Sequence, residues 1–109
     1  MNHIELAWAA GFFDGEGSIG TYANGHLRRN GTRGLVTRLT ITQKDSRPLW
    51  RFWRAVGNLG NVTQRRPDAS HLYGMYALQL VKRADVHQAV WLLWPWLSEP
   101  KREQIARAC

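Results

Sequence analysis

The sequence predicts a single α+β domain in which helices cover one face of a four-stranded, mixed or antiparallel sheet. Three observations predict this class. The 109 residues, 44% of them hydrophobic, suit one domain with one small core. Segments with helical spacing alternate with segments of period two in the order α-β-β-α-β-β-α-α. No internal repeat, low-complexity tract or linker divides the chain, so we expect one domain over residues 1–109.

The first predicted element is a helix over about residues 4–14. Glycines after Asp14 are suited to a helix C-cap. Apolar and small residues recur within the helix at helical spacing: Ile4, Ala7, Trp8, Gly11 and Phe12.

A hairpin follows the helix. Strands are predicted over residues 18–23, ended by Asn24-Gly25, and over residues 35–43, with a basic turn region at residues 26–34 between them. The second strand alternates between two faces: Leu35, Leu39 and Ile41 are apolar and predicted to face the core, whereas Arg38, Thr40 and Thr42 face solvent.

The second half of the chain repeats the helix-hairpin pattern and adds two helices. Ser46 reads as an N-cap with Pro48 in the first turn, and an apolar stripe follows. Strands are predicted over residues 61–65 and 73–80, joined by a turn at residues 66–70. Helices are predicted over residues 85–94, up to Pro95, and over residues 101–108, after Pro100.

Charge and cysteine content restrict the function classes. Fifteen Lys and Arg against eight Asp and Glu give a net charge of +7, which favours a polyanionic partner, nucleic acid ahead of an anionic membrane surface. Cys109 is the only cysteine, which excludes an intramolecular disulfide and a cysteine-based zinc site. No apolar run is long enough for a membrane span. We therefore expect a soluble, unexported protein of a reducing compartment such as the cytoplasm.

The first helix carries two features that suggest a function. Ala7, Gly11 and Gly15 lie at i, i+4 spacing, a small-residue stripe that lets another backbone approach closely. This backbone belongs either to a second helix or to the chain's own strands. Asp14 and Glu16 lie at the C-terminal end of the helix, where the macrodipole disfavours carboxylates, so either Mg²⁺ compensates them or they form a solvated acidic turn.

The nonapeptide AAGFFDGEG at residues 9–17 resembles the LAGLIDADG signature of homing endonucleases. It has the glycine, both acids, the small residue between them and the closing glycine of the signature, and departs from it at Ala9, where a large aliphatic residue is usual. Residues 39–44 and 93–104 resemble later segments of the same family, so the resemblance covers nearly the whole chain.

The resemblance implies a homodimer that cuts both strands of a pseudo-palindromic DNA site and leaves 3′ overhangs. Paired motif helices would meet along Ala7, Gly11 and Gly15. By resemblance, Glu16 ligates Mg²⁺ or another divalent cation such as Mn²⁺, with the Gly15 carbonyl nearby, and Asp14 supports the turn. Gln43 and Lys101 match polar and basic positions beside the metal, Arg47 adds a positive charge, and Arg102 competes with Lys101 for its role. No organic cofactor is expected.

The solvent-facing sides of the strands are expected to form a saddle in the DNA major groove, which accepts a β-ribbon. Arg38 and Arg65 are our candidates for base reading. The full set of predicted DNA-facing residues is Ser18, Gly20, Tyr22, Asn24, Arg38, Thr40, Thr42, Thr63, Arg65, Met75, Ala77 and Gln79 on the strands, and Arg28, Arg29, Arg33 and Arg66 on the hairpin tips.

Two alternatives stay open. A catalytically inactive DNA-binding protein or an RNA-splicing maturase of the same fold would keep the acids only for the turn, although the presence of Glu16, Gln43 and Lys101 favours cleavage.

Tryptophans three residues apart, such as Trp91 and Trp94, favour core or interface packing over base stacking.

Overall fold

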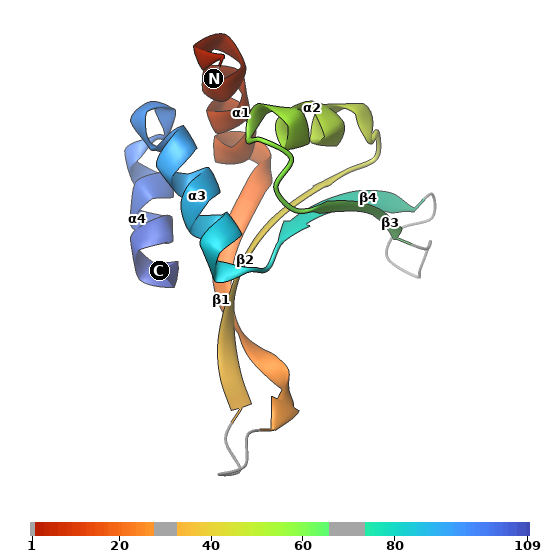
Figure 1. Cartoon of the computed structure of the whole chain (residues 1–109), viewed down its shortest axis with the longest axis vertical. Coiled ribbons are helices and arrows are strands. Elements are labelled where there is room, and N and C mark those ends of the chain that lie inside the picture. The colour runs from red at the N-terminus through yellow and green to blue at the C-terminus, as the bar shows by residue number, and fades with distance from the viewer. Residues whose placement is uncertain (1, 28–32, 66–73) are drawn as a thin grey trace.

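The computed structural model describes residues 2–27, 33–65 and 74–109. Four strands form one sheet in the order β1-β2-β4-β3, and every neighbouring pair is antiparallel. The helices gather against one face of this sheet, and a long β1–β2 arm projects away from them (Figure 1). The predicted α+β class, with four helices and four strands in the described residues, is confirmed, and the sheet is antiparallel rather than mixed.

Helix α1 (His3–Glu16) is longer than predicted. Asn2 caps its start, because the side-chain oxygen accepts hydrogen bonds from the amides of Ile4 and Glu5. The helix runs on through both acids and ends at Gly17, whose φ of −98° is extended rather than left-handed. A glycine is needed at position 17 for space, since an added Cβ would lie 2.2 Å from Cδ2 of Phe13.

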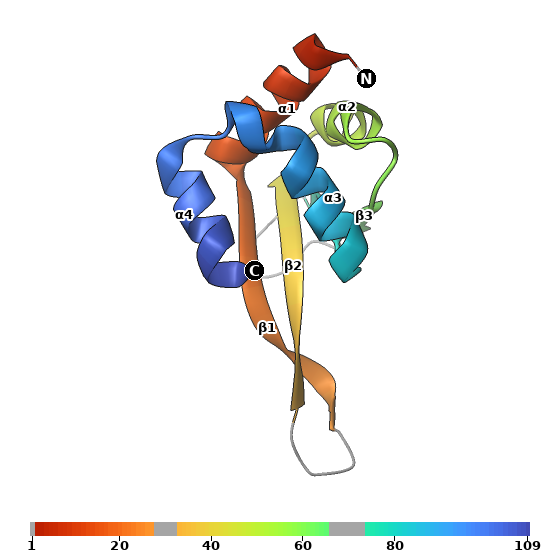
Figure 2. The same cartoon turned by 60° about the vertical axis from the view of Figure 1, so that its left-hand side comes forward.

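The first hairpin is also longer than predicted. β1 (Gly17–Leu27) continues past Asn24-Gly25 because a register shift between Ala23 and Leu27 absorbs the extra residues. β2 (Arg33–Gln43) includes Arg33 and Gly34, which were expected in the turn. Figure 2 shows α4 beside β1 and α3 beside β2, with the far part of the arm beyond both helices.

The core lies between the sheet and the helices. The predicted core positions Leu39 and Ile41 are fully buried, whereas Leu35 is 71% exposed. That part of the prediction is wrong because Leu35 is near the start of β2, where the arm projects beyond the helices. Helix α1 contributes a face that the predicted stripe did not include: Leu6, Ala9, Ala10 and Phe13 are its buried residues.

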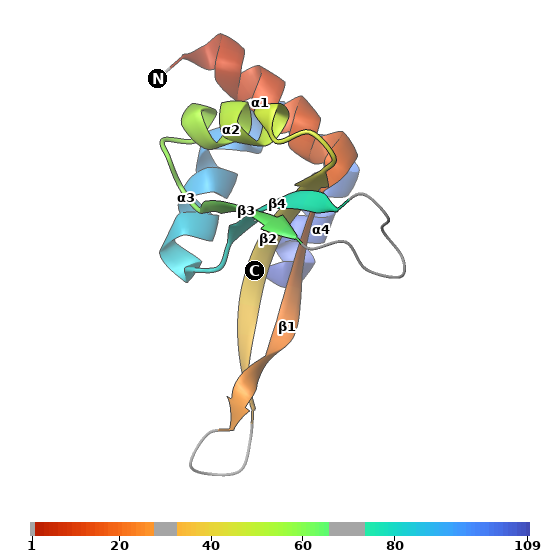
Figure 3. The ribbon, with the colours of Figure 1, turned by 90° about the vertical axis from the view of Figure 1, so that its right-hand side faces the viewer.

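The second helix-hairpin unit follows the prediction with local differences. α2 (Arg47–Ala55) lies against α1 (Figure 3), and β3 (Asn61–Arg65) has its predicted bounds. Ser46 makes no side-chain cap. Asp45 replaces it, because its Oδ1 accepts the amide hydrogen of Arg47 at 2.9 Å. β4 (Met75–Leu80) pairs with β3 and β2; Tyr73 and the predicted turn at residues 66–70 lie outside the described residues.

The last helices frame the site described below. α3 (Arg83–Leu93) is followed by a short 3₁₀ turn, η1 (Trp94–Trp96), and by α4 (Glu99–Ala108). α4 begins two residues earlier than predicted, because Ser98 caps it and Pro100 fits a first helical turn. Trp91 is 76% exposed, so core packing is wrong for this residue. No helix within the described residues is long and apolar enough to cross a membrane.

Candidate active site and nucleic-acid interface

Asp14 joins the end of α1 to the start of α4. Its Oδ2 accepts the amide hydrogen of Ser98 at 2.9 Å, and its Oδ1 accepts the Ser98 hydroxyl hydrogen at 2.6 Å. The same hydroxyl oxygen caps α4 by accepting from the amide of Lys101. Both carboxylate oxygens of Asp14 therefore have protein partners, and the contact holds a helix N-terminus rather than the turn that follows α1.

Glu16 differs from Asp14 in its surroundings. Its side chain is exposed, and its one hydrogen bond among the described residues is the donation from Nε2 of Gln43 to its Oε2 at 3.2 Å. This distance is at the long end for a hydrogen bond to a carboxylate. The Glu16 oxygens thus keep lone pairs free for a ligand, and Gln43 lies beside them as predicted.

Lys101 approaches the motif from α4. Its Nζ donates to the carbonyl of Gly17 and to Oε1 of Gln104, both at 2.9 Å, and lies 4.9 Å from the centre of the Phe13 ring. Burial lowers the pKa of Lys101 below its usual value, and the charge of Asp14 partly opposes that shift. The site therefore holds a partly desolvated cation at the end of α1.

Two other predicted cations are engaged elsewhere. Arg102 donates twice to the carbonyl of Trp94, at 3.1 and 2.7 Å, so Lys101 rather than Arg102 lies beside the motif. Arg47 forms a two-point ion pair with Asp45, and the Arg47 hydrogen bonds lower the pKa of Asp45 to about 2. Arg47 thus lies at the start of α2, where the charge of Asp45 compensates its own.

The small-residue stripe of α1 faces away from the chain's own sheet. Gly11 and Gly15 are exposed, and a Cβ added at either would meet nothing within 4 Å. Ala7 is half-buried, and Ile4 on the same side is 77% exposed. The alternative that Gly11 packs against the chain's own strands is therefore wrong. α1 is apolar on both sides, and one side has no partner among the described residues of this chain.

One copy of the chain offers few metal ligands. No group of three or more His, Cys, Asp or Glu side chains lies together in residues 2–27, 33–65 and 74–109. Glu16 fits a hard divalent cation through its free carboxylate oxygens, and Gly15 lies in the last turn of α1, where carbonyls lack helical partners. The donor set is chemically suitable for Mg²⁺ but incomplete in a single copy.

The sheet face opposite the helices is polar. Ser18, Thr40, Gln79 and Asn61 are successive cross-strand partners and form a row across all four strands. Their neighbours Ile19, Leu39, Leu78 and Leu80 are buried on the other face. The predicted alternation is thus present, and Asn61 joins the predicted face although it was not among the candidates.

The other DNA-face candidates have mixed outcomes. Tyr22 is 45% exposed, Thr63 and Arg65 are exposed, and Gly20, Arg38, Thr42 and Met75 are half-buried. Ala77 pairs with Thr42 and Thr63 and so lies on the predicted face, but it is only 1% exposed, which leaves little of its side chain accessible there. Asn24 and Arg33 lie in β1 and β2, and Arg28, Arg29 and Arg66 lie outside the described residues.

Several contacts near the site were not predicted. Ser98 and Gln104 hold Asp14 and Lys101, and the hydroxyls of Thr21 and Thr37 donate to the carbonyl of Ala108 at 3.0 and 3.2 Å. The last pair ties the end of α4 to the β1–β2 arm. Only Ser98 had a signal in the sequence, because a serine two residues before a proline is typical of a helix start.

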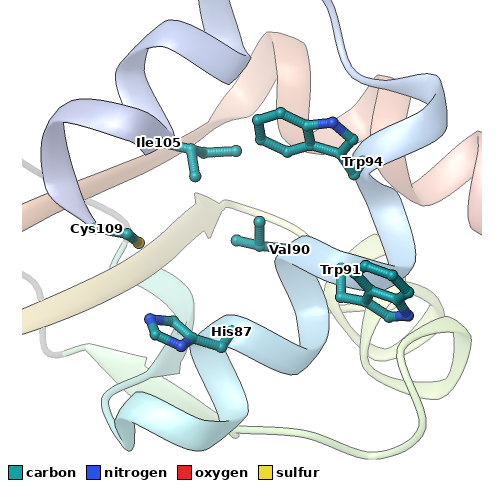
Figure 4. Close-up of a pocket in the computed structure, with 6 residues that line it drawn as sticks. All are labelled: His87, Val90, Trp91, Trp94, Ile105 and Cys109. Carbon is teal, nitrogen blue, oxygen red and sulfur yellow. The ribbon is translucent and has the colours of Figure 1, made fainter.

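An apolar pocket lies apart from the motif, between α3 and α4 (Figure 4). Its volume is about 270 Å³, and its lining comprises His87, Val90, Trp91, Trp94, Ile105 and Cys109. Burial raises the pKa of the Cys109 thiol, which disfavours the reactive thiolate. The pocket therefore lacks an activated nucleophile.

Comparison with known proteins identifies the fold. No protein-family model and no curated protein matches the sequence. Among solved structures, the homing endonuclease I-CvuI in complex with the I-CreI target matches 94% of this chain and 62% of its own, with a TM-score of 0.73 and 21% identity. The archaeal intron-encoded homing endonuclease I-Vdi141I, complexed with DNA, matches 94% of this chain and 64% of its own, with a TM-score of 0.73 and 18% identity.

A longer solved chain has the same fold over part of its length. The LAGLIDADG homing endonuclease I-LtrWI, bound to target DNA, covers 96% of this chain with a TM-score of 0.73 and 19% identity, but only 35% of its own length is matched. The chain thus spans less than two thirds of these solved chains. At such identities the similarity establishes the fold, and the chain has the fold of the LAGLIDADG homing endonucleases, as the motif at residues 9–17 predicts.

Proposed function

We propose that the chain is a metal-dependent, site-specific DNA endonuclease that cuts both strands of a pseudo-palindromic site as a homodimer. The observation that carries the proposal is the contrast at the end of α1. Asp14 is fully bonded within the chain, whereas the Glu16 carboxylate is exposed beside Gln43. An exposed carboxylate at a helix C-terminus is electrostatically unfavourable unless a cation binds there.

A second copy of the chain completes the site. The exposed small residues Gly11 and Gly15 allow two α1 helices to approach closely, and burying the side of α1 that carries Ile4 supplies a hydrophobic driving force. Two Glu16 carboxylates then meet at the paired helix ends. Their mutual repulsion destabilises the dimer unless divalent cations bind between them.

The chemistry divides between these residues. When bound, Mg²⁺ or Mn²⁺ supplies charge stabilisation for the phosphoryl group and lowers the pKa of bound water. Glu16 and the Gly15 carbonyl would hold the cation. Gln43 orients the Glu16 carboxylate through its amide hydrogen bond, and Lys101 places a positive charge at the α1–β1 junction. The expected products have 3′ overhangs.

The DNA lies on the polar sheet face in this proposal. The row formed by Ser18, Thr40, Gln79 and Asn61 offers hydroxyl and amide groups to base edges, and the net charge of +7 favours phosphate contacts. The solved neighbours I-CvuI and I-Vdi141I were both determined as DNA complexes, which supports DNA as the partner.

The proposal is tested by Glu16→Gln, which keeps the shape of the side chain and removes its charge. A site is first selected by cleavage of a randomised duplex library in Mg²⁺. On that site, the variant should lose cleavage by about a thousandfold or more, as loss of a metal ligand worth about 4 kcal/mol would cause. Binding, measured in Ca²⁺, should persist.

Glu103→Gln on α4 is the matched control, because it removes an exposed carboxylate distant in sequence from the motif. The control should cleave like the parent protein. Unchanged cleavage by Glu16→Gln would remove the proposed metal role. Sequence-specific binding without cleavage by the parent protein would instead favour a DNA-binding protein.

The dimer has its own test in Gly11→Leu. The added side chain projects into the proposed interface and holds the two helices apart. The Kd of the dimer should therefore rise by about a hundredfold or more. Sedimentation equilibrium with and without duplex DNA measures this. Gln88→Leu, which adds the same side chain at an exposed position of α3, is the control. A dimeric Gly11→Leu variant would refute this interface.

A further inference from the structure

Gly20, Tyr22 and Arg38 form a compact unit on the polar sheet face. Gly20 and Arg38 are cross-strand partners in β1 and β2, and Tyr22 follows Gly20 on the same side of β1. The guanidinium carbon of Arg38 lies 5.2 Å from the centre of the Tyr22 ring. This is within the range of a cation–π contact, so the aromatic ring covers one face of the cation.

Gly20 provides the space for this arrangement. A Cβ added at Gly20 would lie 3.1 Å from the Tyr22 hydroxyl oxygen and 3.2 Å from Cζ of the same ring. The Tyr22 ring therefore leans back over the glycine instead of standing away from the sheet. A Cβ at position 20 would require the ring to move by a few tenths of an ångström, and a branched side chain such as valine would move it further from its position beside Arg38.

The hydrogen-bonding capacity of Arg38 is unused within the described residues. Its Nε is buried and has no hydrogen-bond partner, and the side chain donates no hydrogen bond to the described protein. With Nε enclosed, the terminal Nη edge is the one left to meet a ligand. Two parallel N–H groups on that edge match the O6 and N7 acceptors of guanine in the major groove.

The position of Arg38 in the sheet favours a base over a phosphate. β4 pairs with β2 only from Leu39 onward, so at Arg38 the sheet has narrowed to the two strands β1 and β2. A two-stranded ribbon is the width that enters the major groove, and Arg38 lies on the polar face of the ribbon, next to the point where β4 joins the sheet. The contact with the Tyr22 ring also reduces the rotamer freedom that Arg38 loses on binding.

We propose that Gly20, Tyr22 and Arg38 are a guanine-reading unit, in which Arg38 donates two hydrogen bonds to O6 and N7 while Tyr22 holds its guanidinium plane. The inference rests on the proposed DNA-binding function. β1 begins directly after Glu16, and Gly20 is four residues beyond Glu16, about 13 Å at about 3.3 Å per residue. The guanine should therefore lie about four base pairs from the cleavage centre, at about 3.4 Å per base pair, once in each half-site.

The test begins with selection of binding sites by the protein from a randomised duplex library in Ca²⁺. A symmetric pair of guanines should appear near the stated distance from the centre. In the selected duplex, 7-deazaguanine at this position removes N7 and should weaken binding by about ten- to hundredfold. Inosine keeps O6 and N7 and should leave affinity within about twofold, since only a minor-groove group is lost.

Protein variants separate the three roles. Arg38→Ala should abolish the guanine preference at this pair of positions and leave preferences elsewhere unchanged. Tyr22→Phe keeps the ring and should keep the preference, whereas Tyr22→Leu and Gly20→Val should relax it. Circular dichroism and thermal melting check that each variant is folded, and Tyr22→Phe with Tyr22→Leu decide the ring's role should Gly20→Val fail to fold.

Each outcome has one reading. If Arg38→Ala weakens all duplexes equally, Arg38 contacts phosphate and the inference is overturned. The inference is also overturned if the parent protein selects and cleaves a site in which no guanine preference is lost in Arg38→Ala. The proposed function then survives. If the parent protein selects no sequence and cleaves none, the proposed function itself fails.

Discussion

The two carboxylates at the end of α1 are two residues apart and have opposite surroundings. Asp14 points to α4 and accepts two hydrogen bonds from Ser98, whereas Glu16 lies near the sheet and accepts one long hydrogen bond from Gln43. Both acids belong to the same motif and carry the same charge. The difference indicates that one acid stabilises the fold and that the other is available to a ligand.

Helix electrostatics explains why Asp14 tolerates its position. The negative C-terminal end of α1 meets the positive N-terminal end of α4, and Asp14 bonds the amide and hydroxyl of the α4 cap. Lys101 adds a cation one turn later by donating to the Gly17 carbonyl. Glu16 has a neutral amide as its partner, so its charge is compensated less within the chain.

The largest stability effect is expected for Asp14→Ala. The substitution removes two hydrogen bonds to a charged acceptor and leaves the α4 cap without its anchor, which should lower the free energy of unfolding by about 2–3 kcal/mol. Urea denaturation followed by circular dichroism measures this. Glu103→Ala, at an exposed position on α4, is the matched control and should stay near the parent value. Equal stability of the two variants would contradict an anchoring role for Asp14.

A smaller effect that depends on pH is expected at Lys101. Burial lowers its pKa, so in alkaline solution the folded chain gives up this proton before the unfolded chain does. Between the lowered pKa and 10.5 the unfolded state binds more protons, and stability should therefore rise with pH in that window.

The comparison of parent protein with Lys101→Met and Lys101→Arg isolates this contribution. Neither variant has a group that titrates in the window at position 101, so the difference in unfolding free energy between parent and variant should change with pH. A difference that is constant from pH 7 to pH 10.5 would show that Lys101 is not desolvated. Cleavage by the parent protein should fall across the same window if the charge is required.

Local sequence patterns predicted the order of the elements and the motif, because those depend on residues close in the chain. The end of α1 was not predictable, since it depends on the Phe13 ring touching Gly17 rather than on a left-handed glycine. The anchoring of Asp14 was equally hidden, because its partner Ser98 lies 84 residues away.

Exposure was the second property that local patterns misjudged. Leu35 and Trp91 fit apolar patterns, yet both are exposed because no other element in the described part of the chain covers them. Conversely, Ala77 follows the alternation of the polar face but is buried by its strand neighbours. Period and spacing give the direction of a side chain, whereas its exposure depends on which other elements lie over it.

The smallest stability effect is expected for Glu16→Gln without metal, and it should differ in sign from that of Asp14→Ala. Removing the charge relieves its unfavourable interaction with the C-terminal end of α1, so in EDTA the variant should be as stable as the parent or up to about 0.5 kcal/mol more stable. Adding Mg²⁺ should raise the melting temperature of the parent and leave that of Glu16→Gln unchanged, because a ligand stabilises only the folded state that binds it. The measurement needs no cleavage, so it tests the metal role of Glu16 separately from catalysis. The melting temperature of the parent protein is also measured as a dimer on its selected duplex. If it does not respond to Mg²⁺ even there, Glu16 does not bind the metal ion that its contrast with Asp14 implies.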